Sequence, residues 1–264
     1  MIETRETKMT DQVQKAERFR ALHIPGKPVV LFNVWDAGSG KAVTASGAKA
    51  IATGSWSVAN ANGFADGEKI PRELAIENLR RIVGATGLPV SFDLESGYGD
   101  APEAVAETIS LAIDAGAVGG NFEDSFPANG KLRDTVDQVA RIRRARQMAG
   151  GTGVRFFINA RTDVFFQRAA EQHDEVMLSD AIARACAYAE AGADGFFAPG
   201  LVNITLIERL VEASPLPVNI MASDSTPSLA ALAKQGVARV SHGPRPYLIA
   251  MKALEEAARA AIGG

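Results

Sequence analysis

Short apolar runs alternate with longer amphipathic stretches along the whole chain. The runs have the residues typical of buried strands and cover 29–32, 50–52, 90–92, 118–122, 156–158, 195–197, 218–220 and 238–240. The stretches between them, such as 103–115 and 180–191, carry apolar residues at helical spacing. The pattern therefore predicts eight strands, each followed by a helix.

Glycine and proline mark the boundaries of these units. Gly47, Gly116, Gly192 and Gly236 each stand between a helical stretch and a strand, where glycine suits the left-handed end of a helix. Three strands begin with a Pro-Val pair, and proline suits a first strand residue that needs no ladder donor. Eight such units in about 250 residues are typical of a closed (β/α)8 TIM barrel.

An open, doubly wound α/β sheet is the alternative architecture. Such a sheet usually has a glycine-rich phosphate loop after its first strand. Here that loop contains Gly38-Ser39-Gly40 and lacks the third glycine, so the barrel is favoured. No linker or change in composition divides the chain, and we interpret residues 1–264 as one domain.

Both ends of the chain add elements to this barrel. Residues 10–23 predict an extra leading helix with Ala16, Phe19 and Leu22 on one face, typical of a helix that covers the barrel bottom. Residues 1–9 are polar and expected to be flexible. The last helix, 247–262, has more apolar surface than one barrel flank would bury.

Composition narrows the class of function. Of the 264 residues, 47% are hydrophobic and 22% are charged, which allows a sizeable core. The net charge is −3 with no basic block, so nucleic acid is not an expected partner. No apolar run approaches the roughly 18 residues of a membrane span, and the N-terminus does not resemble a signal peptide. We therefore expect a cytoplasmic protein with no membrane partner.

Cysteine and histidine contribute little to the predicted chemistry. The single cysteine, Cys186, excludes an internal disulfide and a cysteine-rich metal site, and we expect it in the core. His23 is interpreted as structural and His173 as part of a solvated loop. His242 follows the last strand, where it either reaches the site or belongs to a turn.

Acidic residues gather where the third, fourth and fifth strands end. Barrel enzymes place their catalytic groups at these C-terminal ends. The acids there are Asp93, Glu95, Glu123, Asp124 and Asp163. Like charges this close repel one another unless a cation compensates, and Mg²⁺ prefers such oxygen ligands. Helix capping is the alternative role, above all for Asp124 and Asp163.

Two features of this rim indicate a ligand site. The Asp-x-Glu spacing of Asp93 and Glu95 at a strand end predicts that both side chains point the same way. Arg161 ends the fifth strand, and its planar guanidinium suits a carboxylate or phosphonate of the substrate. A buried ion pair with Glu123 or Asp163 is an alternative that is compatible with this role.

Five motifs follow one another along the chain. They read Thr53-Gly54-Ser55-Trp56-Ser57-Val58-Ala59, Gly63-Phe64-Ala65-Asp66-Gly67-Glu68, Asp93-Leu94-Glu95-Ser96-Gly97-Tyr98-Gly99, Asn121-Phe122-Glu123-Asp124 and Asn159-Ala160-Arg161-Thr162-Asp163. In order and spacing the chain resembles the isocitrate lyase / phosphoenolpyruvate mutase superfamily from about residue 17 onward. The resemblance implies a barrel that binds Mg²⁺, with Mn²⁺ as an alternative, and a 2-oxo acid or its enolate.

The resemblance also implies roles for the acids. Asp93 matches the principal metal carboxylate, and Glu95 stands where the second, usually an aspartate, is found. Glu123 and Asp66 match the outer acids that hold metal-bound waters. Glu123 is in addition a candidate for catalysis.

Further residues match the substrate site of the superfamily. Ser55, Trp56 and Ser57 match donors that bind the carboxylate and oxo oxygens of the substrate, and Asp93 lies beside them. Arg161 matches the substrate-binding arginine. Tyr98 is a candidate proton donor, with a core or gate position as the alternative.

The chain departs from known members after the fourth strand. Lyases for isocitrate and methylisocitrate have Lys-Lys/Arg-Cys-Gly-His there, whereas residues 125–132 contain neither cysteine nor histidine. Phosphonate-handling members have a lysine after Phe-Pro and a histidine after the sixth strand, where Ala128 and Pro199 stand. Lys131 is about three residues out of register for that lysine. Residues 125–131 are instead candidates for a lid.

The remaining interpretation is a Mg-dependent carbon–carbon lyase or decarboxylase. It would act on a small 2-oxo or 2-hydroxy dicarboxylate through a metal-held enolate. One alternative is phosphonopyruvate hydrolase or phosphoenolpyruvate mutase-like activity, and another is a non-catalytic barrel that binds a 2-oxo acid. The superfamily exchanges its eighth helix between subunits, so we expect exchange from about residue 247, after the Pro244-Arg245-Pro246 hinge, in a dimer or tetramer.

Overall fold

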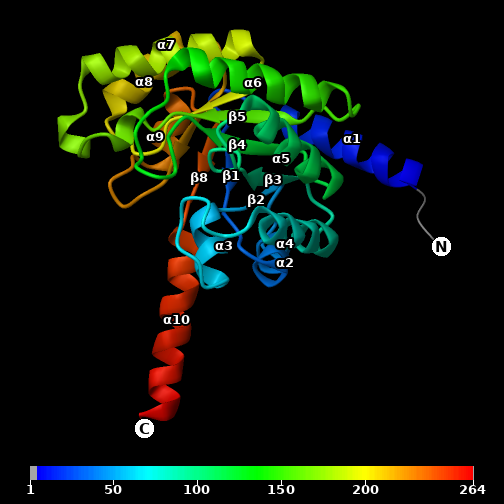
Figure 1. Ribbon diagram of the computed structural model, residues 1–264. Helices are drawn as coiled ribbons and strands as arrows, with labels where there is room; N and C mark the ends of the chain where they lie inside the picture. Colours follow the sequence, from blue (N-terminus) through cyan, green and yellow to red (C-terminus); the bar gives the residue numbers. More distant parts are fainter. Residues whose placement is uncertain (1–4, 264) are drawn as a thin grey trace.

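Eight parallel strands form a single barrel-like sheet in the computed structural model, which describes residues 5–263 (Figure 1). The strands are β1 (Val29–Leu31), β2 (Ile51–Ala52), β3 (Val90–Asp93), β4 (Gly119–Glu123), β5 (Phe157–Arg161), β6 (Gly195–Phe197), β7 (Val218–Met221) and β8 (Arg239–Ser241). They pair in the order β1-β8-β7-β6-β5-β4-β3-β2. A parallel bridge between Val34 and Thr53 links the two end strands. The predicted TIM barrel is confirmed, and the open-sheet alternative is wrong.

Helices surround the barrel and follow the strands in turn. They are α1 (Arg5–Ala21), α2 (Ala37–Ala45), α3 (Ser55–Ala61), α4 (Arg72–Ala85), α5 (Pro102–Asp114), α6 (Thr135–Gly150), α7 (Glu175–Ala191), α8 (Ile204–Ala213), α9 (Leu229–Lys234) and α10 (Arg245–Ile262). Two short 3₁₀ turns, Val164–Phe166 and Ala170–Gln172, connect β5 to α7. No helix among residues 5–263 is long and apolar enough to cross a membrane.

The glycines predicted at the helix-to-strand boundaries have the expected backbone. Gly47, Gly116, Gly192 and Gly236 all have φ between 83° and 102°. Gly116 shows why no other residue fits, because a Cβ there would lie 2.7 Å from a methyl group of Val83. This backbone turn lets each helix return its chain to the start of the next strand.

Helix α1 covers the N-terminal end of the barrel. Phe19 is fully buried and packs edge-on against Phe157, the first residue of β5, with ring centroids 5.5 Å apart. The Gln12 amide donates to the carbonyl oxygens of Ile113 and Ala117. The helix begins at Arg5 and ends at Ala21, earlier at both ends than predicted, and residues 1–4 lie outside the described residues.

His23 follows α1 and is structural, as predicted. Its ring stacks on Phe157 at 4.1 Å, and its Nδ1 donates to the Phe19 carbonyl oxygen. Burial, with the nearby positive charge of Arg239, lowers the pKa of His23 to about 3. The imidazole is therefore neutral in the folded protein, and protonation opposes folding.

We expect His23 to make the protein acid-sensitive. Because its pKa is lower in the folded chain than in the unfolded chain, its contribution is complete above pH 6.5 and is lost as the pH falls toward 3. Between pH 6.5 and pH 4 this amounts to roughly 3 kcal/mol of unfolding free energy. Urea titrations at both pH values should show a shallower pH dependence for His23→Phe. Equal pH dependence in the two proteins would contradict the assignment.

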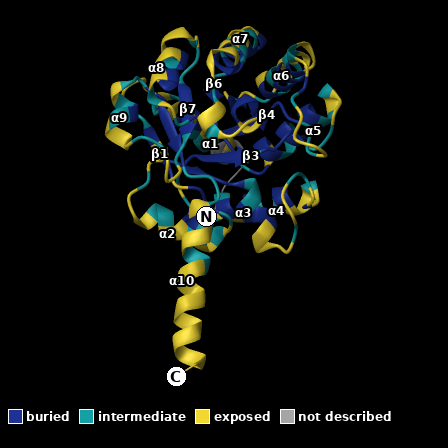
Figure 2. Cartoon of the chain, turned by 90° about the vertical axis from the view of Figure 1, so that its left-hand side faces the viewer, coloured by how far each residue is buried: buried dark blue, intermediate teal, exposed yellow. Residues whose placement is uncertain are grey.

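Helix α10 leaves the barrel instead of packing on it (Figure 1). It begins at Arg245, two residues before the predicted start, with Pro246 in the first turn, where proline is tolerated. Pro246 is its one buried residue, and the rest of the helix is largely exposed (Figure 2). Its apolar residues Leu248, Ile249 and Leu254 are each about half exposed or more.

Candidate active site

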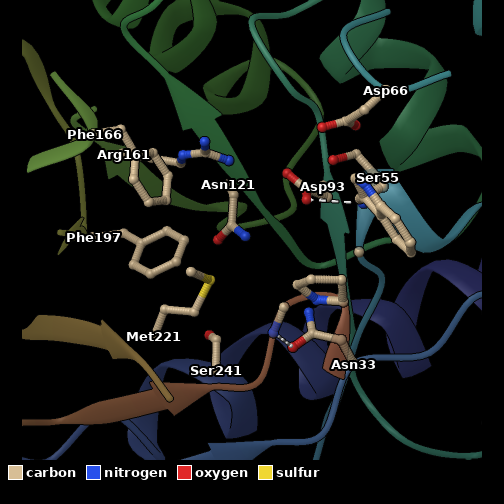
Figure 3. A pocket seen from close by; sticks show the side chains of 14 residues that line it. Asn33, Ser55, Asp66, Asp93, Asn121, Arg161, Phe166, Phe197, Met221 and Ser241 are labelled. Atoms are coloured by element: carbon tan, nitrogen blue, oxygen red, sulfur yellow. Dashed lines mark hydrogen bonds between the residues drawn. The ribbon is translucent and has the colours of Figure 1, made fainter. Parts of the chain in front are cut away.

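A cavity of about 210 Å³ opens at the C-terminal ends of the strands (Figure 3). It is lined by Asn33, Gly54, Ser55, Trp56, Asp66, Asp93, Asn121, Arg161, Phe166, Phe197, Met221, Ser241, Gly243 and Pro244. Pockets for drug-sized ligands usually measure roughly 300–1,000 Å³, so this one suits a small acid. Five residues predicted for the site therefore share one cavity, namely Ser55, Trp56, Asp66, Asp93 and Arg161.

Asp93, the last residue of β3, presents an unsatisfied carboxylate oxygen. Its Oδ2 accepts a hydrogen bond from the Ser55 backbone N–H at 3.0 Å (Figure 3). Its own backbone N–H donates to the Thr53 hydroxyl at 2.8 Å, which fixes the strand end. Oδ1 is buried and has no hydrogen-bond partner among the described residues. A buried anionic oxygen without a partner is costly unless a ligand or cation satisfies it.

Asp66 lies close enough to Asp93 for the two carboxyl groups to interact electrostatically. It belongs to the segment between α3 and α4 and lines the same cavity. Burial raises the pKa of Asp66, and the Asp93 carboxylate raises it further. Two acids that repel each other in one small cavity create a place for a cation.

Arg161 lies at the cavity and also forms the buried ion pairs considered for it. It lines the cavity, and its guanidinium contacts Glu123 Oε2 at 2.7 Å and Asp163 Oδ1 at 2.6 Å. Burial alone would lower the pKa of Arg161, but these two carboxylates outweigh it and raise the pKa. The Ser125 hydroxyl donates to Asp163 Oδ2 at 2.7 Å, which holds the Asp163 carboxylate in place beside Arg161.

Glu123 is positioned behind Arg161 and does not line the cavity. It ends β4 and is buried, and burial raises its pKa while Arg161 opposes that rise. The contact at 2.7 Å favours the ionised carboxylate. Glu123 therefore orients the arginine.

Glu95 and Tyr98 do not line the cavity, but border a small neighbouring pocket together with Asp93 and Ser55. Both have a left-handed backbone, with φ of 51° and 57°, so the alternation expected after Asp93 ends with the strand. Glu95 Oε2 accepts from the Glu68 backbone N–H at 2.6 Å, and the Tyr98 hydroxyl lies 3.4 Å from Oε1. Burial raises the pKa of Glu95 to about 7 and raises that of Tyr98 as well. Asp93 and Glu95 both border that small pocket, but only Asp93 of the two also lines the larger cavity.

The four predicted metal acids thus separate into two groups. Asp93 and Asp66 line the cavity, whereas Glu95 and Glu123 do not: Glu95 accepts from the Glu68 backbone and Glu123 pairs with Arg161. Among residues 5–263 no three His, Cys, Asp or Glu side chains form a ready-made metal cluster. Mg²⁺ commonly takes one or two protein carboxylates and completes its shell with water and substrate oxygens. The free Asp93 oxygen beside Asp66 fits that requirement.

Three further candidate residues lie outside the cavity lining, and His242 belongs to a turn, one of the two roles considered for it. Asp124 is fully buried away from the cavity, where its Oδ2 accepts from the Tyr188 hydroxyl at 2.7 Å and pairs with Arg184 at 3.1 Å. His242 packs its ring against Phe32, and its backbone N–H donates to Asn33 Oδ1. The Ser57 side chain is buried in α3 and does not line the cavity.

Several lining residues were missed by the sequence analysis. Asn33, Asn121 and Ser241 are polar and lie in or next to strands, and Phe166, Phe197 and Met221 form an apolar wall (Figure 3). Polar residues within otherwise apolar runs were the available signal for the first three. The apolar wall gave none, because a site-lining phenylalanine has the same local pattern as a core phenylalanine.

Cys186 is exposed on α7, so its predicted core position was wrong. The buried side of this helix carries Leu178, Ala181, Ala185 and Tyr188. Cys186 falls on the opposite side, and an alanine-rich helix gives little contrast between faces.

We expect Cys186→Ala to leave stability and turnover nearly unchanged. The thiol lies on an outer helix, is exposed and does not line the cavity. Thermal melting and steady-state rates of the two proteins should agree within about twofold in rate and 0.5 kcal/mol in stability. A thousandfold loss of rate would show that the thiol takes part in catalysis.

Comparison with known proteins places the chain in a family. The sequence profile described as phosphoenolpyruvate phosphomutase matches residues 19–262. A crystal structure from Burkholderia cenocepacia J2315, provisionally called a phosphonomutase, has 60% identity and a TM-score of 0.92, covering 96% of this chain and 100% of its own. The uncharacterised protein Rv1998c of Mycobacterium tuberculosis H37Rv is 36% identical over 246 residues, 93% of this chain and 89% of its own length.

A further solved structure carries a named activity. It is a 2,3-dimethylmalate lyase, described as a member of the PEP mutase/isocitrate lyase superfamily, with 26% identity and a TM-score of 0.80. The match covers 93% of this chain and 86% of that one. The fold, the ordered motifs and the family match agree. The chain therefore belongs to the phosphoenolpyruvate phosphomutase family of the isocitrate lyase / phosphoenolpyruvate mutase superfamily.

Proposed function

We propose that the protein is a Mg-dependent lyase or decarboxylase that breaks a carbon–carbon bond in a small 2-oxo or 2-hydroxy dicarboxylate. The observation that carries the proposal is the unpartnered Asp93 oxygen next to Asp66, in the same cavity as Arg161. Acidic groups for a divalent cation and a guanidinium for a carboxylate are the two requirements of such a substrate.

The metal would be held by Asp93, with Asp66 beside it. Mn²⁺ is an alternative because it accepts the same oxygen ligands. When bound, the ion stabilises negative charge that develops on substrate oxygens during bond cleavage.

The protein's own groups bind and orient the substrate. Arg161 presents its guanidinium to a substrate carboxylate, held in place by Glu123 and Asp163 on its other side. Ser55 and Trp56 define the opposite wall. A positioned guanidinium whose partners prevent rotation loses little entropy when the substrate binds.

The strand-4 loop is proposed to exclude water. Residues 125–132 form a hairpin-like loop in which the Phe126 N–H donates to the Lys131 carbonyl oxygen and Ser125 bridges Leu132. This loop meets the segment that carries Asp66, because a Cβ on Gly67 would lie 3.3 Å from the Pro127 carbonyl oxygen. Movement of one segment would therefore affect the other.

Charge favours a lyase over a phosphonate-handling enzyme. Among the described residues that line the cavity, Arg161 is the one cationic side chain, and two carboxylates already pair with it. A phosphonate carries more negative charge than a carboxylate and needs more cationic partners. The activity on 2,3-dimethylmalate for which one relative is named belongs to the class proposed here.

A substrate panel tests this function. Oxaloacetate, methylisocitrate, dimethylmalate and phosphonopyruvate are each incubated with the protein and Mg²⁺, and release of a 2-oxo acid is followed, with a chelator as control. We expect Mg²⁺-dependent release from one of the carbon dicarboxylates. Turnover of phosphonopyruvate alone would contradict the lyase, and Mg²⁺-dependent binding without turnover would identify a binding protein.

We also propose that α10 exchanges between two copies of the chain. In a barrel the helix after β8 normally packs on the outer surface beside β1. Here a groove lies over β1 and α2 instead, and Val30 and Phe32 of its lining are partly exposed. Tyr247 keeps the start of α10 against Trp35 and Trp56 of its own barrel. The exposed remainder of α10 would fill the groove of a second copy, in a dimer or tetramer.

A further inference from the structure

A buried arginine crosses the barrel beneath the cavity. Arg239 is fully buried in β8, yet its Nη2 donates to Asn121 Oδ1 of β4 at 3.1 Å. Strands β8 and β4 lie four places apart in the order of the sheet, on opposite sides of the barrel. The side chain therefore spans the barrel interior. No carboxylate among the described residues forms an ion pair with it. The Asp93 carboxylate is the negative charge that acts on its pKa, which it raises against the effect of burial.

Arg239 fixes two side chains that line the cavity. Besides Asn121, it donates through Nε to the Ser241 hydroxyl oxygen at 3.2 Å. Ser241 also exchanges hydrogen bonds with Asn219 at 3.1 and 3.2 Å, so its hydroxyl is fully used inside the barrel. The Ser241 hydroxyl therefore has no free hydrogen to donate to a ligand in the cavity.

The Asn121 amide, in contrast, has a free donor at the cavity. Its Oδ1 accepts from Arg239 Nη2 and from Asn159 Nδ2, the latter at 2.9 Å. Because a guanidinium can only donate, the oxygen of Asn121 must face Arg239 and the Nδ2 group must face away. Within the described chain Nδ2 has no hydrogen-bond partner, and Asn121 lies between Arg161 and Asp93 at the cavity (Figure 3).

We propose that Arg239 is a positioning residue that holds the Asn121 amide with its Nδ2 hydrogens toward the substrate, where they donate to a carboxylate or oxo oxygen. The inference rests on the proposed function in that the ligand is a small oxo acid. The guanidinium also places a positive charge below a cavity that contains Asp66 and Asp93, which favours an anionic ligand.

Binding of oxalate with Mg²⁺ tests the inference without turnover. Oxalate presents two adjacent carboxylates, as a 2-oxo acid presents a carboxylate beside an oxo group, and calorimetry gives its affinity directly. Asn121→Ala should weaken binding by at least about tenfold, the loss expected for a hydrogen bond to a charged group. Arg239→Gln should have a similar effect. The double variant should be no weaker than Arg239→Gln alone, because both changes remove one donor.

Asn121→Asp separates positioning from folding. It replaces the donor with an anionic oxygen, so oxalate binding should fall by more than about a hundredfold. The same carboxylate would give Arg239 the ion-pair partner it lacks, so the melting temperature should not fall. This variant decides the question even where Arg239→Gln does not fold.

Arg184→Lys is the matched control. Arg184 is also buried but pairs with Asp124 outside the cavity, so its replacement should lower stability and leave oxalate affinity unchanged. Unchanged oxalate affinity in Asn121→Ala, additive effects of Arg239→Gln and Asn121→Ala, or a wild type that does not bind oxalate would each overturn the inference. A wild type that binds oxalate but cleaves no dicarboxylate would contradict only the proposed function.

Discussion

Asp93→Ala is expected to abolish Mg²⁺-dependent turnover and leave the barrel folded. Among the described residues, Asp93 is the one cavity carboxylate with a free buried oxygen, and the substitution removes it. Loss of a metal ligand should lower the rate by at least about a thousandfold, which corresponds to roughly 4 kcal/mol of transition-state stabilisation. The backbone N–H of Ser55 loses its acceptor, but the repulsion between Asp93 and Asp66 disappears, so the two effects on stability oppose each other.

Steady-state rates with and without a chelator, together with thermal melting, test this prediction. Asp137→Ala is a suitable control because Asp137 is an exposed acid on α6 that does not line the cavity. Its rate should match that of the wild type. Full activity of Asp93→Ala, or wild-type activity that ignores the chelator, would contradict a metal at this position.

Deletion of residues 247–264 is expected to give aggregated or unfolded protein. The truncated chain keeps the groove over β1 but loses the helix that would cover the same groove in a second copy. Exposed apolar surface of this kind promotes association. Solution scattering of the full-length protein should show a dimer or a tetramer. A monodisperse species of 27.8 kDa at micromolar concentration would rule out the exchange.

Phe32→Glu gives a milder test of the same exchange. In the isolated chain Phe32 is 38% exposed, so a glutamate there would cost little unless a second copy covers it. Burying the charge in an interface should shift the assembly toward smaller species. Val176→Glu on the exposed side of α7 is the control and should not change the mass. Identical masses for both variants would mean that α10 does not occupy the groove.

The strands were predictable because parallel barrel strands are buried on both faces and appear as apolar runs. Their C-terminal ends were less predictable. The apolar run of the fifth strand covers only 156–158, but β5 extends to Arg161, which the sequence analysis had placed at the strand end, because the functional residues of a barrel continue the strand after the apolar pattern stops. In the same way, β3 and β4 each extend one polar residue beyond their apolar runs, to Asp93 and Glu123.

The site was predictable where a motif residue ends a strand in an extended conformation, as for Asp93 and Arg161. It was not predictable where the backbone leaves that conformation, as at Glu95 and Tyr98. Arg239 was missed because its partner Asn121 is 118 residues away in sequence. The available signal was Arg239 itself, a single cationic residue within the apolar run 238–240. Such a residue is informative because burying a charge is costly unless hydrogen bonds or an ion pair compensate.

Two consecutive acids, Glu123 and Asp124, end up on opposite sides of one backbone. The first supports Arg161 at the cavity, and the second joins Arg184 and Tyr188 between β4 and α7. Selection for a new substrate can therefore act on position 123 while position 124 continues to secure the surrounding helix. Comparisons among descendants of this barrel should find the two neighbouring positions diverging at unequal rates.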